Sequence, residues 1–132
     1  MVPPPLPVPA PGRPVRLLFV CWGNICRSPT AEGIMRRMVD EAGLTGAVEV
    51  DSVATSDEEL GRPPDRRAVA EADRHGLDLR DLRARRVTAD DWRRADLLLV
   101  MDDLVERALV RTAPDAAARA KVARITDFDP DY

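Results

Sequence analysis

The chain has 132 residues, a length that fits one domain. Hydrophobic residues make up 45% of it and charged residues 33%, so a core and a polar surface are both available. The net charge of -3 gives no reason to expect a nucleic-acid partner, and no apolar run approaches the roughly 20 residues that span a bilayer. Two cysteines and one histidine, without paired CxxC spacing, argue against a metal site, and we expect no cofactor.

Residues 1–14, MVPPPLPVPAPGRP, are rich in proline and should form an extended, mobile leader with some polyproline II structure. This stretch lacks the basic start and the unbroken apolar helix of a signal peptide. An SH3-type ligand is the alternative, but Arg13 is the one basic residue near the prolines. We therefore expect a leader followed by one domain over residues 15–132, in the cytoplasm, where thiols stay reduced.

After the leader, short apolar runs alternate with amphipathic stretches. Strands are predicted at residues 15–20, 48–54, 97–101 and 121–125. Helices are predicted from a first turn containing Pro29 to Gly43, through Ala68 to His75 with Gly76 at the end, and over residues 103–111. This alternation favours right-handed crossovers, and so a three-layer α/β fold with a four-stranded parallel sheet and helices on both faces.

Segments that lie far apart in the sequence should meet at one edge of this sheet. Ligands of such sheets bind beyond the carboxyl ends of the strands. Cys21 follows the first predicted strand, Asp102 follows the third, and the stretch after Ile125 follows the fourth. We therefore expect a ligand site at this edge.

The loop VCWGNICRSPT, which follows the first strand, carries the features of a phosphate site. Its backbone N–H groups can form an anion-binding nest, and the helix after it adds a positive N-terminal end. Gly23 permits a positive φ, Asn24 tolerates one, and Arg27 can bind two phosphate oxygens with its planar fork. The same positive field favours a thiolate, so we predict that Cys21 is a nucleophile that attacks phosphorus.

The alternative for Cys21 is an inert small residue at the end of a buried strand. A Cys and an Arg six residues apart are weak evidence for catalysis when they occur alone. Here they occur with Gly, Asn, Ser and Pro between a strand and a helix, and Ser28 is placed to donate a hydrogen bond to the sulfur. The sequence therefore favours the catalytic interpretation.

The stretch LLFVCWGNICRSPTAEGIMRR strongly resembles the active-site loop and first helix of the low-molecular-weight protein tyrosine phosphatases. The similarity continues in the same order through DSVATS, GRPPDRRA, RHGL, VTADDW, ADLLLVMD and KVARITDFDP, and so covers Arg16 to Pro130. The resemblance implies a flavodoxin-like fold and metal-free hydrolysis of phosphotyrosine in proteins through a phosphocysteine intermediate. It also implies inorganic phosphate and vanadate as ligands.

The resemblance assigns a role to each residue of the loop. Cys21 would form the phosphocysteine, Arg27 would bind phosphate, and Ser28 would assist the thiolate. Asn24 would hold the strained turn of the loop together with Ser52. The other loop residues implied in phosphate or substrate binding are Trp22, Gly23, Ile25 and Cys26.

Further positions beside the loop are interpreted through the same resemblance. Cys26 would form a reversible disulfide with Cys21 and protect the nucleophile from over-oxidation; the alternative is a small loop residue. Glu58 occupies a position where an aromatic ring is common, and Trp22 could supply that ring instead. Asp102 matches a family position, and we favour a structural role for it over a catalytic one.

The general acid is the part of the pattern that departs from the family. A phenol leaves with a pKa of about 10 and needs a proton donor, which in the family is the Asp of a late D-P-Y-Y-G loop. By its alignment, Asp129 in the final DFDPDY is an earlier Asp, and that loop and the last helix would be absent. We favour a truncated chain, with exposed apolar surface and a monomer or weak dimer, over a shortened loop in which Asp129 or Asp131 serves. Asp129 is the candidate acid.

Three functions follow from these residues. A protein tyrosine phosphatase is favoured. A pseudophosphatase that binds phosphate or phosphoproteins without turnover is the alternative, because the acid is in doubt. A thiol-dependent arsenate reductase would need a further cysteine pair to relay the disulfide, and no cysteine follows Cys26.

Overall fold

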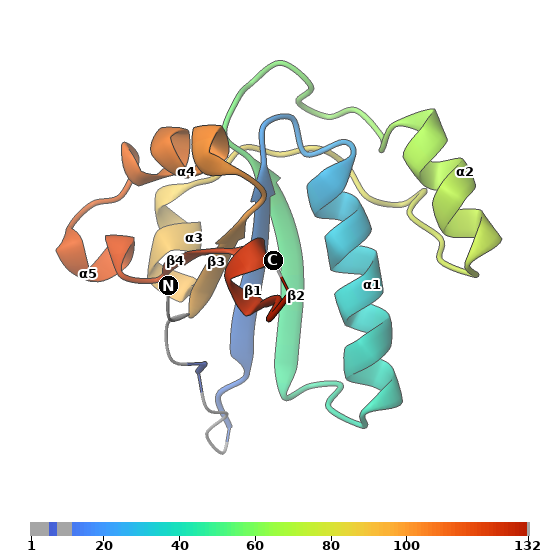
Figure 1. The fold of residues 1–132 in the computed structure, drawn as a ribbon, viewed down its shortest axis with the longest axis horizontal. Helices are drawn as coiled ribbons and strands as arrows, with labels where there is room; N and C mark the ends of the chain where they lie inside the picture. The colour runs from blue at the N-terminus through green and yellow to red at the C-terminus, as the bar shows by residue number, and fades with distance from the viewer. Residues whose placement is uncertain (1–5, 8–11, 132) are drawn as a thin grey trace.

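The computed structural model describes residues 6–7 and 12–131 (Figure 1). Its centre is a four-stranded parallel sheet in the order β2-β1-β3-β4. The strands are β1 (Val15–Cys21), β2 (Val48–Ala54), β3 (Leu97–Val100) and β4 (Val122–Arg124). Each predicted strand is present, with ends no more than one residue from the prediction. The strand order is the one that flavodoxin-like sheets use for their first four strands, so the predicted fold is confirmed.

The helices are partly those that the sequence predicted. They are α1 (Arg27–Glu41), α2 (Arg66–Arg74), α3 (Ala89–Arg94), α4 (Asp103–Val110), α5 (Ala116–Arg119) and the 3-10 helix η1 (Ile125–Phe128). The sequence pattern predicted α1, α2 and α4 but not the three short helices α3, α5 and η1. A signal for α3 was present, because Thr88 and Asp91 form a capping box in which the Asp91 N–H donates to Thr88 Oγ1 at 3.2 Å.

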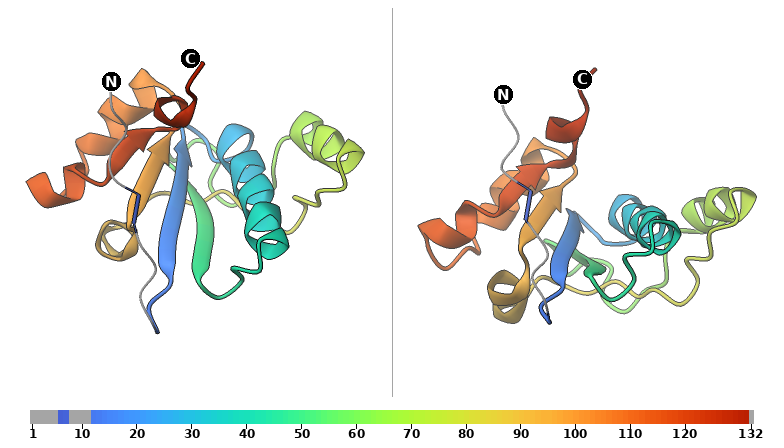
Figure 2. Two further views of the ribbon diagram at one scale, coloured as in Figure 1. Left: turned by 60° about the horizontal axis from the view of Figure 1, so that its bottom comes forward. Right: turned by 90° about the horizontal axis from the view of Figure 1, so that it is seen from below.

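Helices cover both faces of the sheet, as Figures 1 and 2 show. On one face α1 packs over β1 and β2 and covers the first core cluster, and η1 lies at the end of β4. On the other face α3, α4 and α5 enclose the second core cluster. Successive side chains of a strand point to opposite faces, so Leu18 and Val20 enter the second cluster while Phe19 enters the first. Because β1 is buried on both faces, its last residue, Cys21, stands on a rigid base and is 4% exposed.

The carboxyl ends of the parallel strands meet at one edge of the sheet (Figure 2). There β1 leads into the loop before α1, β3 leads to Asp102 at the start of α4, and β4 leads into η1. The sequence predicted a ligand site at this edge, which brings together the segments that follow Cys21, Val100 and Arg124.

The predicted leader falls largely outside the described residues, which omit 1–5 and 8–11. Near its end, Arg13 Nη2 donates to Asp96 Oδ1 at 2.8 Å, next to the start of β3. The division of the chain at residue 14 stays a prediction. Across the part of the chain that the structure describes, no helix is long and apolar enough to cross a membrane.

Leu98 should be one of the residues on which folding depends most. It lies in β3, is 0% exposed, and packs in the cluster under α3, α4 and α5. The change Leu98→Ala should lower the free energy of unfolding by about 2–5 kcal/mol, because it removes buried methyl groups and leaves a cavity. Leu104→Ala is the matched control: Leu104 is 59% exposed, and its loss should change stability by less than about 0.5 kcal/mol. Urea unfolding measures both, and equal effects would contradict this description of the core.

Candidate active site

The loop between β1 and α1 is held by hydrogen bonds from the segment that follows β2. The Thr55 N–H donates to Cys21 O at 3.1 Å, and the Ser56 N–H donates to Trp22 O at the same distance. The Asp65 N–H donates to Ile25 O at 2.6 Å. These bonds occupy loop carbonyl groups and none of the loop N–H groups, which an anion-binding nest needs.

Asn24 gives the loop its sharpest turn. Its φ is 57°, and it is the one non-glycine residue with positive φ in the described part of the chain. Its side chain is buried, with Nδ2 donating to Ser28 Oγ at 2.8 Å and to Ser52 Oγ at 2.9 Å. Its Oδ1 accepts from the Arg85 N–H at 3.1 Å. Because that N–H can only donate, it fixes which way the amide points.

The Cys21 sulfur lies inside this network. The Asn24 N–H donates to Sγ at 3.2 Å, and Ser28 Oγ lies 2.9 Å from Sγ. Since Asn24 Nδ2 already donates to Ser28 Oγ, the hydroxyl hydrogen of Ser28 is available to point at the sulfur. The geometry therefore offers two hydrogen-bond donors to Cys21, one from the backbone and one from a side chain.

Glu32 is a buried carboxylate in the same network, and the sequence analysis missed it. Its residue is 1% exposed, and Oε1 accepts a hydrogen bond from Ser52 Oγ at 2.6 Å. Arg36 Nη2 lies 2.6 Å from Oε2, in an ionic contact whose direction does not meet hydrogen-bond geometry. The available signal was its spacing: Glu32 stands one helical turn after Ser28 and one turn before Arg36.

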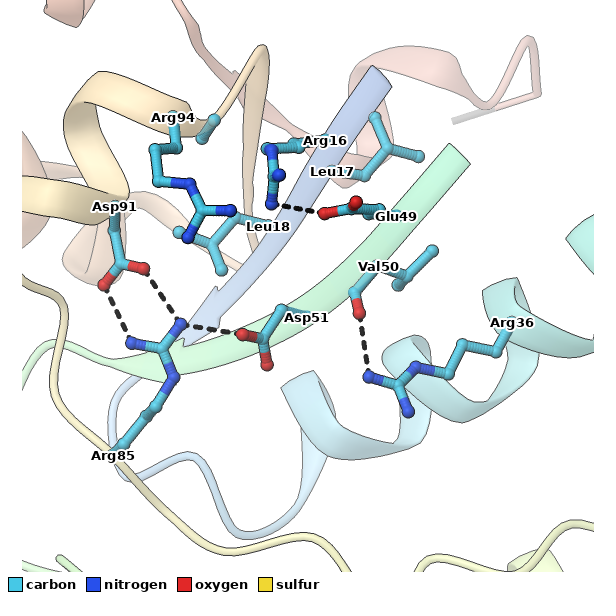
Figure 3. A pocket seen from close by; sticks show the side chains of 11 residues that line it. Arg16, Leu17, Leu18, Arg36, Glu49, Val50, Asp51, Arg85, Asp91 and Arg94 are labelled. Carbon is cyan, nitrogen blue, oxygen red and sulfur yellow. Dashed lines mark hydrogen bonds and ion pairs between the residues drawn. The ribbon is translucent and has the colours of Figure 1, made fainter. Parts of the chain in front are cut away.

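Arg85 ties the loop to a set of ion pairs, which Figure 3 shows around a cleft of about 220 Å³. Its guanidinium donates to both Asp91 oxygens at 2.9 Å and to Asp51 Oδ2 at 2.8 Å. These hydrogen bonds, and above all the bonds that Arg85 donates to Asp91, raise the pKa of Arg85. Because its backbone N–H holds Asn24, Arg85 links the loop to β2 and α3.

Arg27 and Asp102 meet across the edge of the sheet. Arg27 Nη1 donates to Asp102 Oδ2 at 2.8 Å, and both side chains are about half exposed. Asp102 also caps α4, since its Oδ1 accepts from the Val105 N–H at 2.8 Å. The Val105 N–H and then Arg27 hold the pKa of Asp102 below its ordinary value. The structure thus brings the loop and the end of β3 together.

The remaining loop residues differ in exposure. Trp22 is 39% exposed. Both cysteines have free thiols, but Cys21 is buried and Cys26 is exposed. The redox pairing of the two cysteines stays a prediction. Gly23 has close neighbours: a Cβ there would lie 3.2 Å from Cγ of Glu59, so a larger residue would crowd this wall of the loop.

The structure does not join Asp129 to the loop through any described hydrogen bond. Asp129 is exposed just after η1; its N–H donates to Thr126 O at 3.1 Å, and its Oδ1 accepts from the Asp131 N–H at 2.9 Å. Both contacts are local. The assignment of the general acid to Asp129 stays a prediction.

An apolar groove of about 860 Å³ begins at the loop, where Cys26 and Arg27 line it. It runs along α1, past α2 on one side and past Met101 and Ile125 on the other. Ile34 and Met38 of α1 are 45% and 55% exposed there. Apolar surface therefore lies beside the loop. Among the described residues, no group of three or more His, Cys, Asp or Glu could hold a metal ion.

Glu32 should make the protein less stable as the pH rises. Burial raises the pKa of Glu32, against the opposing effects of the Ser52 hydrogen bond and the Arg36 charge. The folded state then holds this proton more tightly than the unfolded state. We therefore compare the free energy of unfolding of the wild type with that of Glu32→Gln. Their difference should fall as the pH rises from about 4.3, the pKa of Glu in an unfolded chain, to the pKa of Glu32 in the folded state. Urea unfolding across this range measures the difference, and a difference that rises with pH would contradict the description.

Known proteins resemble the chain along nearly its whole length. A family model described as low molecular weight phosphotyrosine protein phosphatase matches residues 16–132. The low molecular weight phosphotyrosine protein phosphatase of Gallus gallus is 38% identical over 122 residues, which are 92% of this chain and 77% of that protein. The low molecular weight protein-tyrosine-phosphatase of Streptomyces coelicolor is 42% identical over 115 residues, 87% of this chain and 70% of that protein.

A solved structure agrees with these sequence relatives. The crystal structure of YfkJ from Bacillus subtilis superposes with a TM-score of 0.87 at 31% identity, over 93% of this chain and 77% of that one. The family model covers the sheet, the loop and every helix described above. The chain belongs to the low molecular weight phosphotyrosine protein phosphatase family.

Proposed function

We propose that the chain hydrolyses phosphotyrosine in proteins through a phosphocysteine intermediate on Cys21. The observation that carries this proposal is the environment of the sulfur, which receives one hydrogen bond from the Asn24 N–H and lies 2.9 Å from Ser28 Oγ. A merely structural cysteine has no need of such donors, whereas a thiolate is stabilised by them. The names of the relatives, which are phosphotyrosine protein phosphatases, support the substrate class.

In the first step the phosphate of the substrate binds in the loop. The loop N–H groups and the N-terminal end of α1 hold its oxygens, and Arg27 binds two of them. Cys21 Sγ then attacks phosphorus, so that an S–P bond forms while the P–O bond to the tyrosine oxygen breaks. The electron pair of the broken bond goes to the phenol oxygen, which takes up a proton from the general acid.

In the second step water attacks the phosphocysteine and gives its proton to the general acid, which the first step left deprotonated. A new P–O bond forms, the S–P bond breaks to release inorganic phosphate, and its electron pair returns to Cys21 as a thiolate. Ser28 stabilises this leaving sulfur with its hydroxyl hydrogen. Asn24 and Ser52 act on the loop instead of the phosphorus: their hydrogen bonds keep the positive φ of Asn24 in place, so that the N–H groups stay convergent.

Asp129 is the candidate proton donor, with Asp131 as the second choice. Both follow η1 at the edge of the sheet that carries the loop. Their local hydrogen bonds favour a second function for comparison: a phosphate-binding protein that holds phosphate or a phosphoprotein without turnover. The two functions differ in whether a phenol can leave, and substrates with different leaving groups separate them.

Metal-free hydrolysis of an activated aryl phosphate and of a phosphotyrosine peptide tests the proposal. The wild type should turn over both, and Cys21→Ser should turn over neither. Asp129→Asn should lower kcat on the peptide by about 10²-fold or more, because general acids contribute 10²–10⁴-fold, and should spare the activated ester, whose leaving group needs little help. An equal loss on both substrates would remove Asp129 from the acid role. Phosphate or vanadate binding without any turnover would establish the phosphate-binding alternative.

Asn24 offers a second test, because its backbone and its side chain can be separated. Asn24→Gly keeps a residue that adopts positive φ easily and loses the hydrogen bonds to Ser28, Ser52 and Arg85. Asn24→Ala loses both features, so its free energy of unfolding should be about 1 kcal/mol lower than that of Asn24→Gly. Urea unfolding measures this order, and phosphate affinity should be weakened in both variants. An alanine variant as stable as the glycine variant would show that the positive φ carries no strain.

A further inference from the structure

Arg27 begins α1, and its side chain extends over the carboxyl edge of the sheet, half in solvent. A long side chain in such a place would sample many rotamers if nothing held it, and phosphate binding would have to order it. The structure shows one partner for it: Nη1 donates to Asp102 Oδ2 at 2.8 Å. The remaining guanidinium nitrogens, Nε and Nη2, have no partner among the described residues.

Asp102 is well suited to hold another side chain, because it is itself held twice. It follows β3, whose last residue, Val100, is 0% exposed in the centre of the sheet. Its Oδ1 accepts from the Val105 N–H at 2.8 Å and so fixes the carboxylate on the first turn of α4. One oxygen is therefore used to fix the carboxylate, and the other is directed at Arg27.

Together these observations show that the nitrogens of the guanidinium differ in their surroundings. Arg27 meets Asp102 through Nη1, while its Nε and Nη2 edge stays free to bind two oxygens side by side. We propose that Asp102 is a positioning residue that orients Arg27 for bidentate phosphate binding. This inference rests on the proposed function, because it takes Arg27 to be the phosphate-binding arginine of the loop.

The negative charge of Asp102 could act on phosphate binding in two opposite ways. A carboxylate close to a bound phosphate dianion repels it, so an Asp102 that only competed for Arg27 would weaken phosphate binding. Removing its charge would then strengthen binding. An Asp102 that positions Arg27 gives the opposite result, since its loss leaves the guanidinium unordered. The sign of the change in phosphate affinity therefore decides between the two roles.

Two substitutions separate the contact with Arg27 from the cap on α4. Asp102→Asn keeps an oxygen for the Val105 N–H and removes the charge. Asp102→Ser also keeps a capping oxygen, but its side chain is too short to reach Arg27. Asp115→Ser is the matched control, because Asp115 caps α5 in the same way, accepting from the Ala118 N–H at 2.7 Å, on a helix that does not bear the loop.

The measurements are the affinity for inorganic phosphate and for vanadate by titration calorimetry, and the urea midpoint of each variant. Both Asp102 variants should bind phosphate about 5-fold more weakly, the upper end for a half-exposed ion pair. KM for an aryl phosphate should rise by a similar factor, with a smaller change in kcat. Asp115→Ser should bind phosphate like the wild type, and the urea midpoints of the Asp102 variants should not fall below that of Asp115→Ser.

Unchanged or tighter phosphate binding in both Asp102 variants overturns the inference. The inference is also overturned if the Asp102 variants bind phosphate more weakly and have lower urea midpoints, and Asp115→Ser binds phosphate equally weakly. The effect would then come from loss of a helix cap. A wild type that binds phosphate without hydrolysing any ester contradicts the proposed function alone, and the affinities still decide the role of Asp102. A wild type that binds neither phosphate nor vanadate overturns both.

Discussion

The left-handed backbone of Asn24 is the constraint around which the site is built. A residue other than glycine adopts such a φ at a cost, and the surroundings must offset it. Here one buried amide does so with three hydrogen bonds: both of its N–H groups donate to hydroxyl oxygens, and its oxygen accepts from a backbone N–H. The turn that results aims the Asn24 N–H at the sulfur of Cys21. The same amide therefore stabilises the strained backbone and keeps the Asn24 N–H directed at the sulfur.

This amide depends in turn on charged residues outside the loop. Ser52 can accept from Asn24 because its own hydrogen is taken by the buried Glu32. The N–H that orients the amide belongs to Arg85, whose guanidinium is fixed by Asp51 and Asp91. Buried or half-buried ion pairs add little net stability, since desolvation offsets their attraction. Their value here is positional: they fix the donors and acceptors that surround the loop.

Much of the fold and the loop could be predicted from the sequence, because these parts depend on local signals. The apolar run through Val20 reads as a buried strand, and Gly23, Asn24 and Arg27 read as a phosphate loop. The partners Glu32 and Arg85 carry weaker local signals, of which the spacing of Glu32 with Ser28 and Arg36 is one. Each looks like an ordinary surface residue of an amphipathic or polar stretch, and its role arises from contacts with Asn24 or Ser52 across the fold. The short helices α3 and α5 were missed because stretches of four to six residues show no full apolar period.

The residues proposed for the two halves of the reaction differ in how firmly the fold holds them. Phosphate binding and attack use Cys21, Ser28 and Arg27, which stand on β1 and α1 and are tied to β2 and β3 through buried strands and short hydrogen bonds. Protonation of the leaving group would use a segment beyond η1 whose contacts are local. In the proposed reaction the first half would bind the phosphate of any ester, whereas the second would supply the proton, so the rate should depend on the leaving group. The same division explains why the nucleophile is readable from sequence while the acid is not: the loop is encoded in eight consecutive residues, Cys21 to Ser28, whereas the acid is defined by where its segment folds.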